Sequence, residues 1–257
     1  MEKIKLFREL AKRFPKSIKS HHDRIGLMTG KLPDEINHIL LCLDFDEIVL
    51  EKVKKMDKKP DLILTHHPFI YGPRKTILKY NDAKRAVCEA IDALNIPVYS
   101  MHTNFDSGRD GMNDALAEAL NLKNIHPLEG CKMARGGELE KAMEIHEFAL
   151  YANKCLNVEY SHLIFAGKKQ IKTVAIVGGA GSREFKTAMD EGFDIFISGD
   201  IPHHARRDII ANHYNFLDMP HEIEKIFMPQ MKKLLASIDP TLKVQIIDHE
   251  VIPELIK

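Results

Sequence analysis

The segment Asp61-Leu62-Ile63-Leu64-Thr65-His66-His67-Pro68 decides how this chain can fold. Its apolar run is typical of a strand buried on both faces, and Pro68 cannot continue a strand ladder, so the strand should end at the histidines. Ligands of open α/β sheets bind at the carboxyl ends of the strands. Neighbouring residues of an extended chain point to opposite sides, so His66 and His67 suit two adjacent metal ions better than one. Alone, such a pair is equally typical of hydrogen-bonded surface histidines.

Strands and helices alternate around this segment. We expect helices over residues 2–14, 47–58, 81–94 and 113–120, and strands over 37–44, 61–65 and 96–100. Short connections between them imply parallel pairing through right-handed crossovers. Residues 123–170 suggest a hairpin-like, mixed region.

The second half of the chain repeats the first. A strand over 172–177, a glycine turn, a helix over 183–191 and a strand over 194–200 follow the earlier order. Each second strand consists of an aspartate, three apolar residues and a hydroxyl residue, and each precedes a His-His pair. Duplication explains this pattern, and chance similarity of two βαβ units is the alternative. We therefore expect an α/β protein of two similar, interleaved lobes (1–125 and 126–257, or one continuous domain) with mostly parallel central strands and a metal site between the lobes at the strand carboxyl ends.

Composition excludes several classes of protein. Lysine plus arginine and aspartate plus glutamate both total 37 in 257 residues, which argues against a protein that works mainly by neutralising phosphates. No apolar run of about 18 residues is present, so a membrane span is excluded. The start lacks the apolar core of a signal peptide, and the four cysteines are widely spaced, as expected for reduced thiols. These features predict a cytoplasmic protein.

Two further segments supply candidate carboxylates. Asp106 follows the strand over 96–100, in the layer where the histidine pair emerges, although an isolated Asp can also simply open a turn. His221 and Glu224 are three residues apart at the start of an expected helix, with Pro220 suited to its first turn. A surface histidine beside a solvated glutamate is the alternative there, and Glu222 competes for the carboxylate role.

Together these side chains form a set of three imidazoles and two carboxylates. Such a set suits two divalent ions such as Zn, Mn, Fe, Ni or Co and leaves positions open for water. The glycine turn Gly178-Gly-Ala-Gly181 weakly resembles a phosphate-binding loop. Close helix packing explains its glycines equally well, so we predict no nucleotide cofactor.

The ordered set of motifs resembles one family over essentially the whole chain. The motifs are Thr65-His66-His67-Pro68, His102-Thr-Asn-Phe-Asp106 with Gly111-Met-Asn113-Asp, Ser198-Gly-Asp200 with His204, and His221-Glu-Ile-Glu224. They are similar to those of the dinuclear-metal-centre proteins called GTP cyclohydrolase I type 2 homologues, or NGG-interacting-factor-3-like proteins.

The resemblance implies a two-metal site with one bridging carboxylate, inside a toroidal homohexamer. Its metal ligands would be His66, His67, Asp106, His221 and Glu224. Asp200 and His204 would lie near the metals. Longer members carry an inserted middle domain that this chain is too short to contain, and where the family usually has glycine before the last histidine this chain has Pro220.

A metal-dependent hydrolase is the function that these features favour. The substrate would be a nucleotide, a phosphoester or a cyclic amide, with GTP ring opening as one candidate, and His204 or His102 would act as the catalytic proton carriers. The alternative is a hexameric metal-containing scaffold that engages a protein partner or single-stranded nucleic acid. Basic side chains that a nucleic-acid-binding ring would use are Lys52, Lys54, Lys55, Lys58, Lys59, Arg206 and Arg207.

Overall fold

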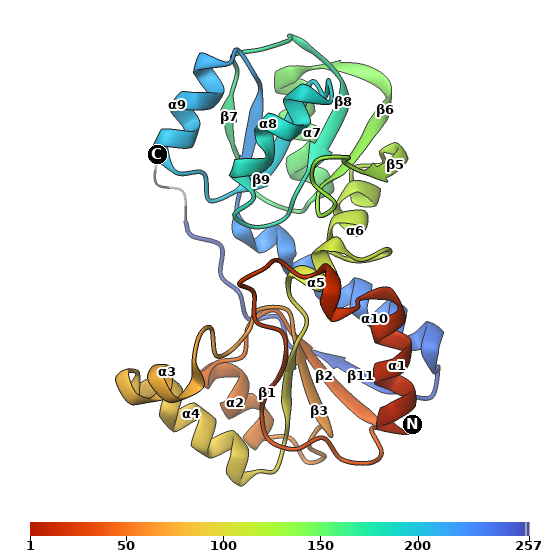
Figure 1. Cartoon of the computed structure of the whole chain (residues 1–257), viewed down its shortest axis with the longest axis vertical. Helices are drawn as coiled ribbons and strands as arrows, with labels where there is room; N and C mark the ends of the chain where they lie inside the picture. Colours follow the sequence, from red (N-terminus) through yellow and green to blue (C-terminus); the bar gives the residue numbers. More distant parts are fainter. Residues whose placement is uncertain (255, 257) are drawn as a thin grey trace. The chain divides into compact units, whose positions relative to one another are not determined.

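The computed structural model describes residues 1–254 and residue 256, and contacts within it divide them into two compact units (Figure 1). The first unit contains residues 1–109 and 227–250, and the second contains residues 110–226 with the described residues from Val251 onward. The expected class, two interleaved α/β lobes with mostly parallel central strands, is confirmed. The division differs from the expected 1–125 and 126–257, because the chain returns at residue 227 to complete the first unit.

The sheet of the first unit has the strand order β1-β4-β3-β2-β11. The four strands β4, β3, β2 and β11 run parallel, and β1 pairs antiparallel with β4 at one edge. Every residue of β2 and β3 is buried, as parallel strands covered on both faces require. The strands are β1 (Gly26–Thr29), β2 (His38–Cys42), β3 (Leu62–Thr65), β4 (Val98–Ser100) and β11 (Lys243–Ile246).

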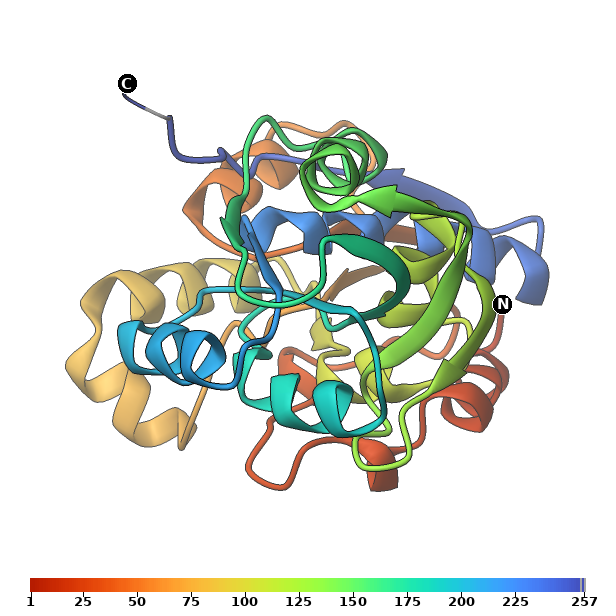
Figure 2. The ribbon, with the colours of Figure 1, turned by 90° about the horizontal axis from the view of Figure 1, so that it is seen from above.

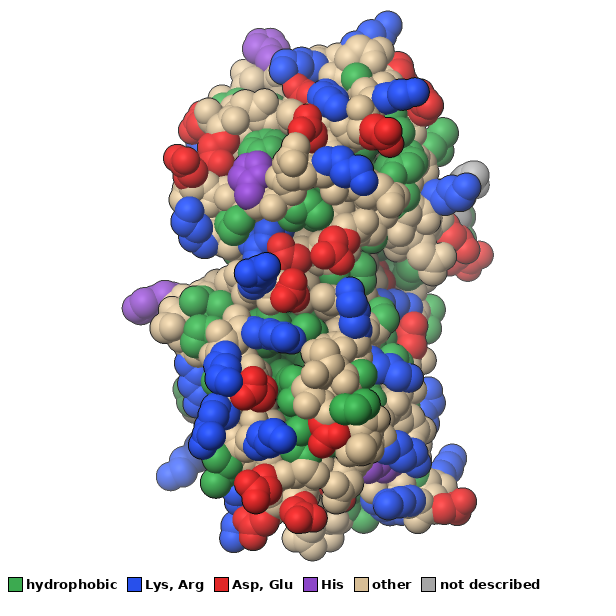
Figure 3. Space-filling view, turned by 90° about the vertical axis from the view of Figure 1, so that its right-hand side faces the viewer, with side chains coloured by type: hydrophobic (Ala, Val, Ile, Leu, Met, Phe, Trp, Pro, Cys, Tyr) green, Lys and Arg blue, Asp and Glu red, His purple; other side chains and the backbone are tan. Residues whose placement is uncertain are grey.

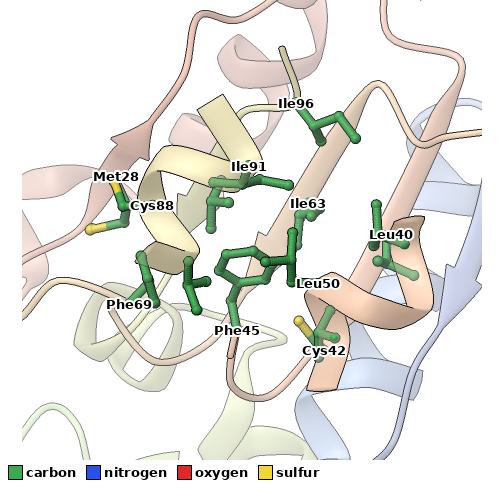
Figure 4. Packing of buried hydrophobic residues seen from close by; sticks show 14 of the residues in the cluster. Met28, Leu40, Cys42, Phe45, Leu50, Ile63, Phe69, Cys88, Ile91 and Ile96 are labelled. Carbon is green, nitrogen blue, oxygen red and sulfur yellow. The ribbon is translucent and has the colours of Figure 1, made fainter. Parts of the chain in front are cut away.

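Helices cover both faces of this sheet (Figure 1). On one face, Leu50 of α2 and Ile91 of α4 pack toward Ile63 of β3 (Figure 4). The helices α3 and α4 lie side by side in both ribbon views (Figures 1 and 2). On the other face, α10 packs against β2 and β11. The helical segments are α1 (Lys3–Arg13), η1 (Lys16–Ile18), α2 (Glu47–Lys54), α3 (Arg74–Tyr80), α4 (Asp82–Ala93), α5 (Thr103–Ser107) and α10 (Phe227–Ile238).

The second unit is built on a six-stranded sheet with the order β5-β6-β8-β9-β10-β7. Its central strands β8, β9 and β10 are parallel, and the outer strands pair antiparallel. The strands are β5 (Lys123–Pro127), β6 (Arg135–Glu144), β7 (His162–Ile164), β8 (Gln170–Ile176), β9 (Ile195–Gly199) and β10 (Phe216–Met219). The helical segments are α6 (Met112–Ala119), α7 (Ile145–Cys155), η2 (Ser182–Glu184), α8 (Phe185–Asp190), α9 (His203–Ala211) and η3 (His221–Ile226).

The repeat that the sequence suggested is present in the hydrogen bonds of both units. Asp61, just before β3, accepts hydrogen bonds from the backbone N–H groups of Asn37 and His38 at 2.8 and 2.9 Å. Asp194, just before β9, accepts from the N–H groups of Lys172 and Thr173 in β8, which directly precede the residues of β8 that pair with β9, at 2.8 and 2.9 Å. In each unit the aspartate therefore ties two neighbouring parallel strands together.

Two segments differ from the expected secondary structure. The helix expected to begin near Pro220 is a 3₁₀ helix over His221–Ile226 that leads into α10, and the residues just before it, 216–219, form strand β10. Short apolar runs are compatible with either element, and pairing with β9 and β7 selects the strand. The mixed region over 123–170 contains the helix α7 as well as strands. Among the described residues, no helix is both long enough and apolar enough to cross a membrane.

The aspartate before β3 gives a stability prediction. Asp61→Ala removes the acceptor shared by two strand-start N–H groups, one of which belongs to the buried His38. We expect the free energy of unfolding, measured by urea denaturation, to fall by about 1–3 kcal/mol. Asp57→Ala, at an exposed position of the same connection, should change it by less than about 0.5 kcal/mol. Equal losses in the two variants would contradict this role of Asp61.

Candidate metal centre

The turn after β3 holds His66 and His67 in a fixed position. The backbone N–H groups of both residues donate to the carbonyl of Leu43, at 3.2 and 3.1 Å. The Thr65 hydroxyl donates to the carbonyl of His67 at 2.8 Å. The chain bends here instead of staying extended, so the two rings do not point to opposite sides as expected. Their centroids lie 4.9 Å apart.

Hydrogen bonds at Nδ1 decide which nitrogen of each ring is available to a ligand. The Nδ1 of His66 lies 2.9 Å from the carbonyl oxygen of Met101, and the Nδ1 of His67 lies 2.7 Å from the Asp44 carboxylate. Both oxygens can only accept, so each Nδ1 carries the proton. The lone pair of each ring is therefore on Nε2, which is the arrangement of metal-binding histidines held by outer hydrogen-bond partners.

Asp106 lies on α5, immediately beside this pair. Its Oδ1 is 3.6 Å from Nε2 of His66, and both residues are buried. The rings of Phe105 and Phe227 pack near the His66 ring, at centroid distances of 6.5 and 5.3 Å. The first unit thus brings Asp106 together with the histidine pair in surroundings partly shielded from water.

A third imidazole, that of His102, belongs to the same cluster. Its ring centroid lies 5.1 Å from that of His66 and 5.6 Å from that of His67. One nitrogen from each of the three rings lies within 4.8 Å of the other two. The Nδ1 of His102 is 2.7 Å from Oδ1 of Asp23.

Asp23 is a buried carboxylate surrounded by donors. It also accepts from the backbone N–H of Arg24 at 2.6 Å and from the N–H of Thr103 at 3.1 Å. Burial on its own would raise the pKa of Asp23, but the hydrogen bonds from His102 and Thr103 outweigh burial and lower the pKa to about 2. Asp23 is therefore ionised at neutral pH and keeps the proton of His102 on Nδ1.

The second unit places His221 and Glu224 together on η3. A 3₁₀ helix has about three residues per turn, so residues three apart lie in line. The Nε2 of His221 is 3.0 Å from Oε2 of Glu224, and its Nδ1 is 2.5 Å from Oδ2 of Asp200. Glu224 is 3% exposed, whereas the competing Glu222 is half-buried.

The glycine turn after β8 makes room for Glu224. Gly179 has a φ of +63°, and a Cβ at this position would overlap Oε1 of Glu224. The N–H of Gly178 donates to the Asn113 side chain at 2.7 Å. Close packing around a buried carboxylate therefore accounts for these glycines.

The donor sets of the two clusters fit a divalent metal ion. Each imidazole is held at Nδ1 by an oxygen acceptor, and each cluster contains a buried carboxylate next to a ring nitrogen. Imidazole and carboxylate donors suit ions such as Zn²⁺, Mn²⁺ and Fe²⁺.

His204, the other predicted proton carrier, is exposed at the start of α9. Neither histidine cluster includes it. Asp200 follows β9 with a φ of +52°, a strained backbone conformation for an aspartate, and it is the residue that contacts His221.

A cavity of 260 Å³ adjoins His221 in the second unit. Tyr160, His162 and Asp218 line it, together with Asp200. Burial raises the pKa of Asp218, against the opposing effects of the N–H of Ile201 and of His162.

Sequence reasoning missed three residues that support the clusters. Asp44 directly follows the strand over 38–42, and a carboxylate at such a strand end is a signal that could have found it. Gly179 lay in a turn already noted. Asp23 lies 79 residues from its partner His102 in an unpatterned segment, where no local signal exists.

Gly179→Ala tests the contact between the glycine turn and Glu224. We expect the added methyl group to displace the Glu224 carboxylate and to weaken Zn²⁺ binding, measured by calorimetry, by about 10-fold or more. Gly192→Ala is the matched control, because Gly192 also has a positive φ, of +84°, but a Cβ added there would meet nothing within 4 Å. Equal Zn²⁺ affinities in the two variants would contradict the contact.

The low pKa of Asp23 predicts an acid-dependent contribution to stability. Because its pKa is lowered on folding to about 2, the stabilisation is fully present above the unfolded pKa of about 4 and is lost as the pH falls through about 2. The difference in the free energy of unfolding between the wild type and Asp23→Asn should therefore shrink over this range. A difference that stays constant down to pH 2 would contradict the assignment.

Comparison with known proteins places the chain in one family. The family model described as Duf34/NIF3 (NGG1p interacting factor 3) matches residues 1–254. A "GTP cyclohydrolase 1 type 2 homolog" of Clostridium perfringens is 34% identical over 215 residues, covering 80% of each chain. One of Lactococcus lactis is 28% identical over 242 residues, covering 92% of each. The crystal structure of a Bacillus cereus protein related to NIF3 has the same fold, with a TM-score of 0.87, 20% identity and coverage of 100% of this chain and 99% of that one. The chain therefore belongs to the Duf34/NIF3 family.

Proposed function

We propose that this protein is a divalent-metal-dependent hydrolase that acts on a nucleotide or on a related phosphoester or cyclic amide. The proposal extends to two divalent ions, with His66, His67 and Asp106 as ligands in the first unit and His221 and Glu224 as ligands in the second. The name carried by its relatives, GTP cyclohydrolase 1 type 2 homolog, agrees with this substrate class.

The observation that carries the proposal is that imidazoles lie together with buried carboxylates in the two clusters. The Nδ1 atoms of His66, His67 and His221 each lie against an oxygen acceptor. The Nε2 atoms of His66 and His221 lie 3.6 and 3.0 Å from the carboxylates of Asp106 and Glu224. Histidines outside the clusters, such as His126, also bond an oxygen through Nδ1. The clustered rings differ from them because they lie beside other imidazoles or buried carboxylates, as metal ligands do. Divalent ions in such a site supply Lewis acidity and make water a nucleophile at neutral pH.

Individual side chains then have defined tasks. Asp106 and Glu224 are buried and supply negative charge, which offsets the charge of divalent ions. The residues able to move a proton are His102, whose Asp23 partner keeps the proton on Nδ1, and His204 on the exposed start of α9.

The cavity beside His221 supports a substrate with a flat ring. The rings of Tyr160 and His162 lie 5.9 Å apart at their centroids and offer aromatic surface. Asp218, half-buried in the same cavity, offers a carboxylate to N–H donors. Guanine presents both a flat face and two adjacent N–H donors, N1–H and the 2-amino group, so a guanine nucleotide matches this lining.

A scaffold that binds nucleic acid has less support. Such a protein needs a field of positive charge, but Lys54 pairs with Glu51 on α2. On the face drawn in Figure 3, lysine and arginine side chains are interspersed with aspartate and glutamate. The toroidal homohexamer stays part of the proposal, and sedimentation velocity tests it.

Metal analysis combined with a hydrolysis screen tests the proposed function. Purified wild type, His67→Ala and Glu224→Ala would be assayed for bound metal and for turnover of nucleotides, phosphoesters and cyclic amides. We expect the wild type to contain metal and to hydrolyse at least one class, and both variants to lose at least about 10-fold in metal affinity and activity.

His126→Ala is the control, because His126 is exposed and bonds the carbonyl of Asn124 outside both clusters. It should match the wild type in both assays. A wild type that holds metal but turns over none of the three classes would contradict the hydrolase proposal.

A further inference from the structure

The same arrangement of side chains follows the third parallel strand of each unit. Two residues after β10 comes His221, followed three residues later by Glu224. Two residues after β4 comes His102, followed four residues later by Asp106. In the first unit His102 directly precedes α5 and Asp106 lies on it. In the second unit both His221 and Glu224 lie on η3. The repeat therefore makes His102 the counterpart of His221.

The counterpart relation extends to the outer hydrogen bonds. The Nδ1 of His221 lies 2.5 Å from the carboxylate of Asp200, and the Nδ1 of His102 lies 2.7 Å from that of Asp23. In both cases an acceptor-only group holds the ring proton on Nδ1. The Nε2 of His102 is then the nitrogen turned away from Asp23, just as the Nε2 of His221, which lies 3.0 Å from Glu224, is turned away from Asp200.

From this we propose that His102 is an additional ligand of a divalent cation held by the first unit, and that Asp23 is the positioning residue that makes it one. The cation would be shared with Nε2 of His66 and His67 and with the carboxylate of Asp106. This proposal rests on the proposed function only in assuming that the protein binds metal, and it adds a ligand to the five implied by the family resemblance.

The geometry of the cluster supports this assignment. Ligand nitrogens around one zinc-like ion lie about 2.0–2.1 Å from it, so they cluster within about 4 Å of one another. One nitrogen from each of His66, His67 and His102 lies within 4.8 Å of the others, and Asp106 lies 3.6 Å from the Nε2 of His66. This spacing is compatible with donors that share one ion.

The surroundings of Asp23 suit a positioning role. Its side chain is only 2% exposed, whereas the His102 side chain is 22% exposed. The hydrogen bonds from Arg24 and Thr103 fix the carboxylate against the chain, so its orientation does not depend on His102. A fixed carboxylate can therefore set the orientation of the imidazole.

Two measurements on the full chain test the proposal. Long-range ¹H–¹⁵N NMR of the metal-free protein reports which nitrogen of His102 carries the proton, and Co²⁺ titration followed by visible absorption reports metal affinity. Asp23→Asn replaces an acceptor-only group by an amide that also donates. We expect it to remove the fixed Nδ1–H tautomer of His102 and to weaken Co²⁺ binding by about 10–100-fold. His102→Ala, which leaves Asp23 bonded to Arg24 and Thr103, should weaken Co²⁺ binding at least as much.

Asp46→Asn is the matched control. Asp46 also holds a histidine, His249, at 2.8 Å in the same unit, but His249 is not part of the cluster. The Co²⁺ affinity of this variant should stay within about 2-fold of the wild type. The proposal is overturned if Asp23→Asn and His102→Ala bind Co²⁺ like the wild type, or if the His102 tautomer is the same with and without Asp23. A metal-binding wild type without hydrolytic activity would remove the proposed function and leave this proposal intact.

Discussion

The hydrogen bond at Nδ1 of each clustered histidine is the constraint on which the chemistry of this protein depends. An imidazole with a free Nδ1 can present either nitrogen, whereas a ring held by an oxygen acceptor presents only Nε2. His66 is held by a backbone carbonyl, and His67, His102 and His221 are held by carboxylates. The acceptors come from the ends of parallel strands and the loops beside them, so the fold itself sets the orientation of the donors.

The two units fix the orientation of their histidine rings in the same way. In each unit an aspartate ties two neighbouring parallel strands together. In each unit the third parallel strand is also followed by a histidine and, three or four residues later, by a carboxylate. The repeat therefore includes both the strand pairing and the histidine and carboxylate side chains. It differs at the second strand, where the first unit adds a histidine pair directly after β3 and the second unit has Asp200.

Much of this framework could be predicted from the sequence. The buried run before His66 and the proline after His67 placed the strand end, and the matching pattern around Asp194 predicted the second sheet. The relation of Asp106 to the histidine layer followed from the shared carboxyl edge of parallel strands.

Other features depend on contacts that no local pattern encodes. The bend at His66 and His67 arises because both backbone N–H groups find the same carbonyl, that of Leu43. Residues 216–219 form a strand because β9 and β7 flank them, although the run fits a helix equally well on its own. Asp23 reaches His102 across 79 residues, so only the folded chain reveals the pair.

Anomalous diffraction at the metal edge, from crystals of the full chain grown with Zn²⁺, tests the central claim most directly. We expect ions about 2.0–2.1 Å from the Nε2 atoms of His66, His67 and His221, with each Nδ1 still bonded to its oxygen acceptor. Zinc bound through Nδ1, or bound only at sites away from these histidines, would contradict that claim.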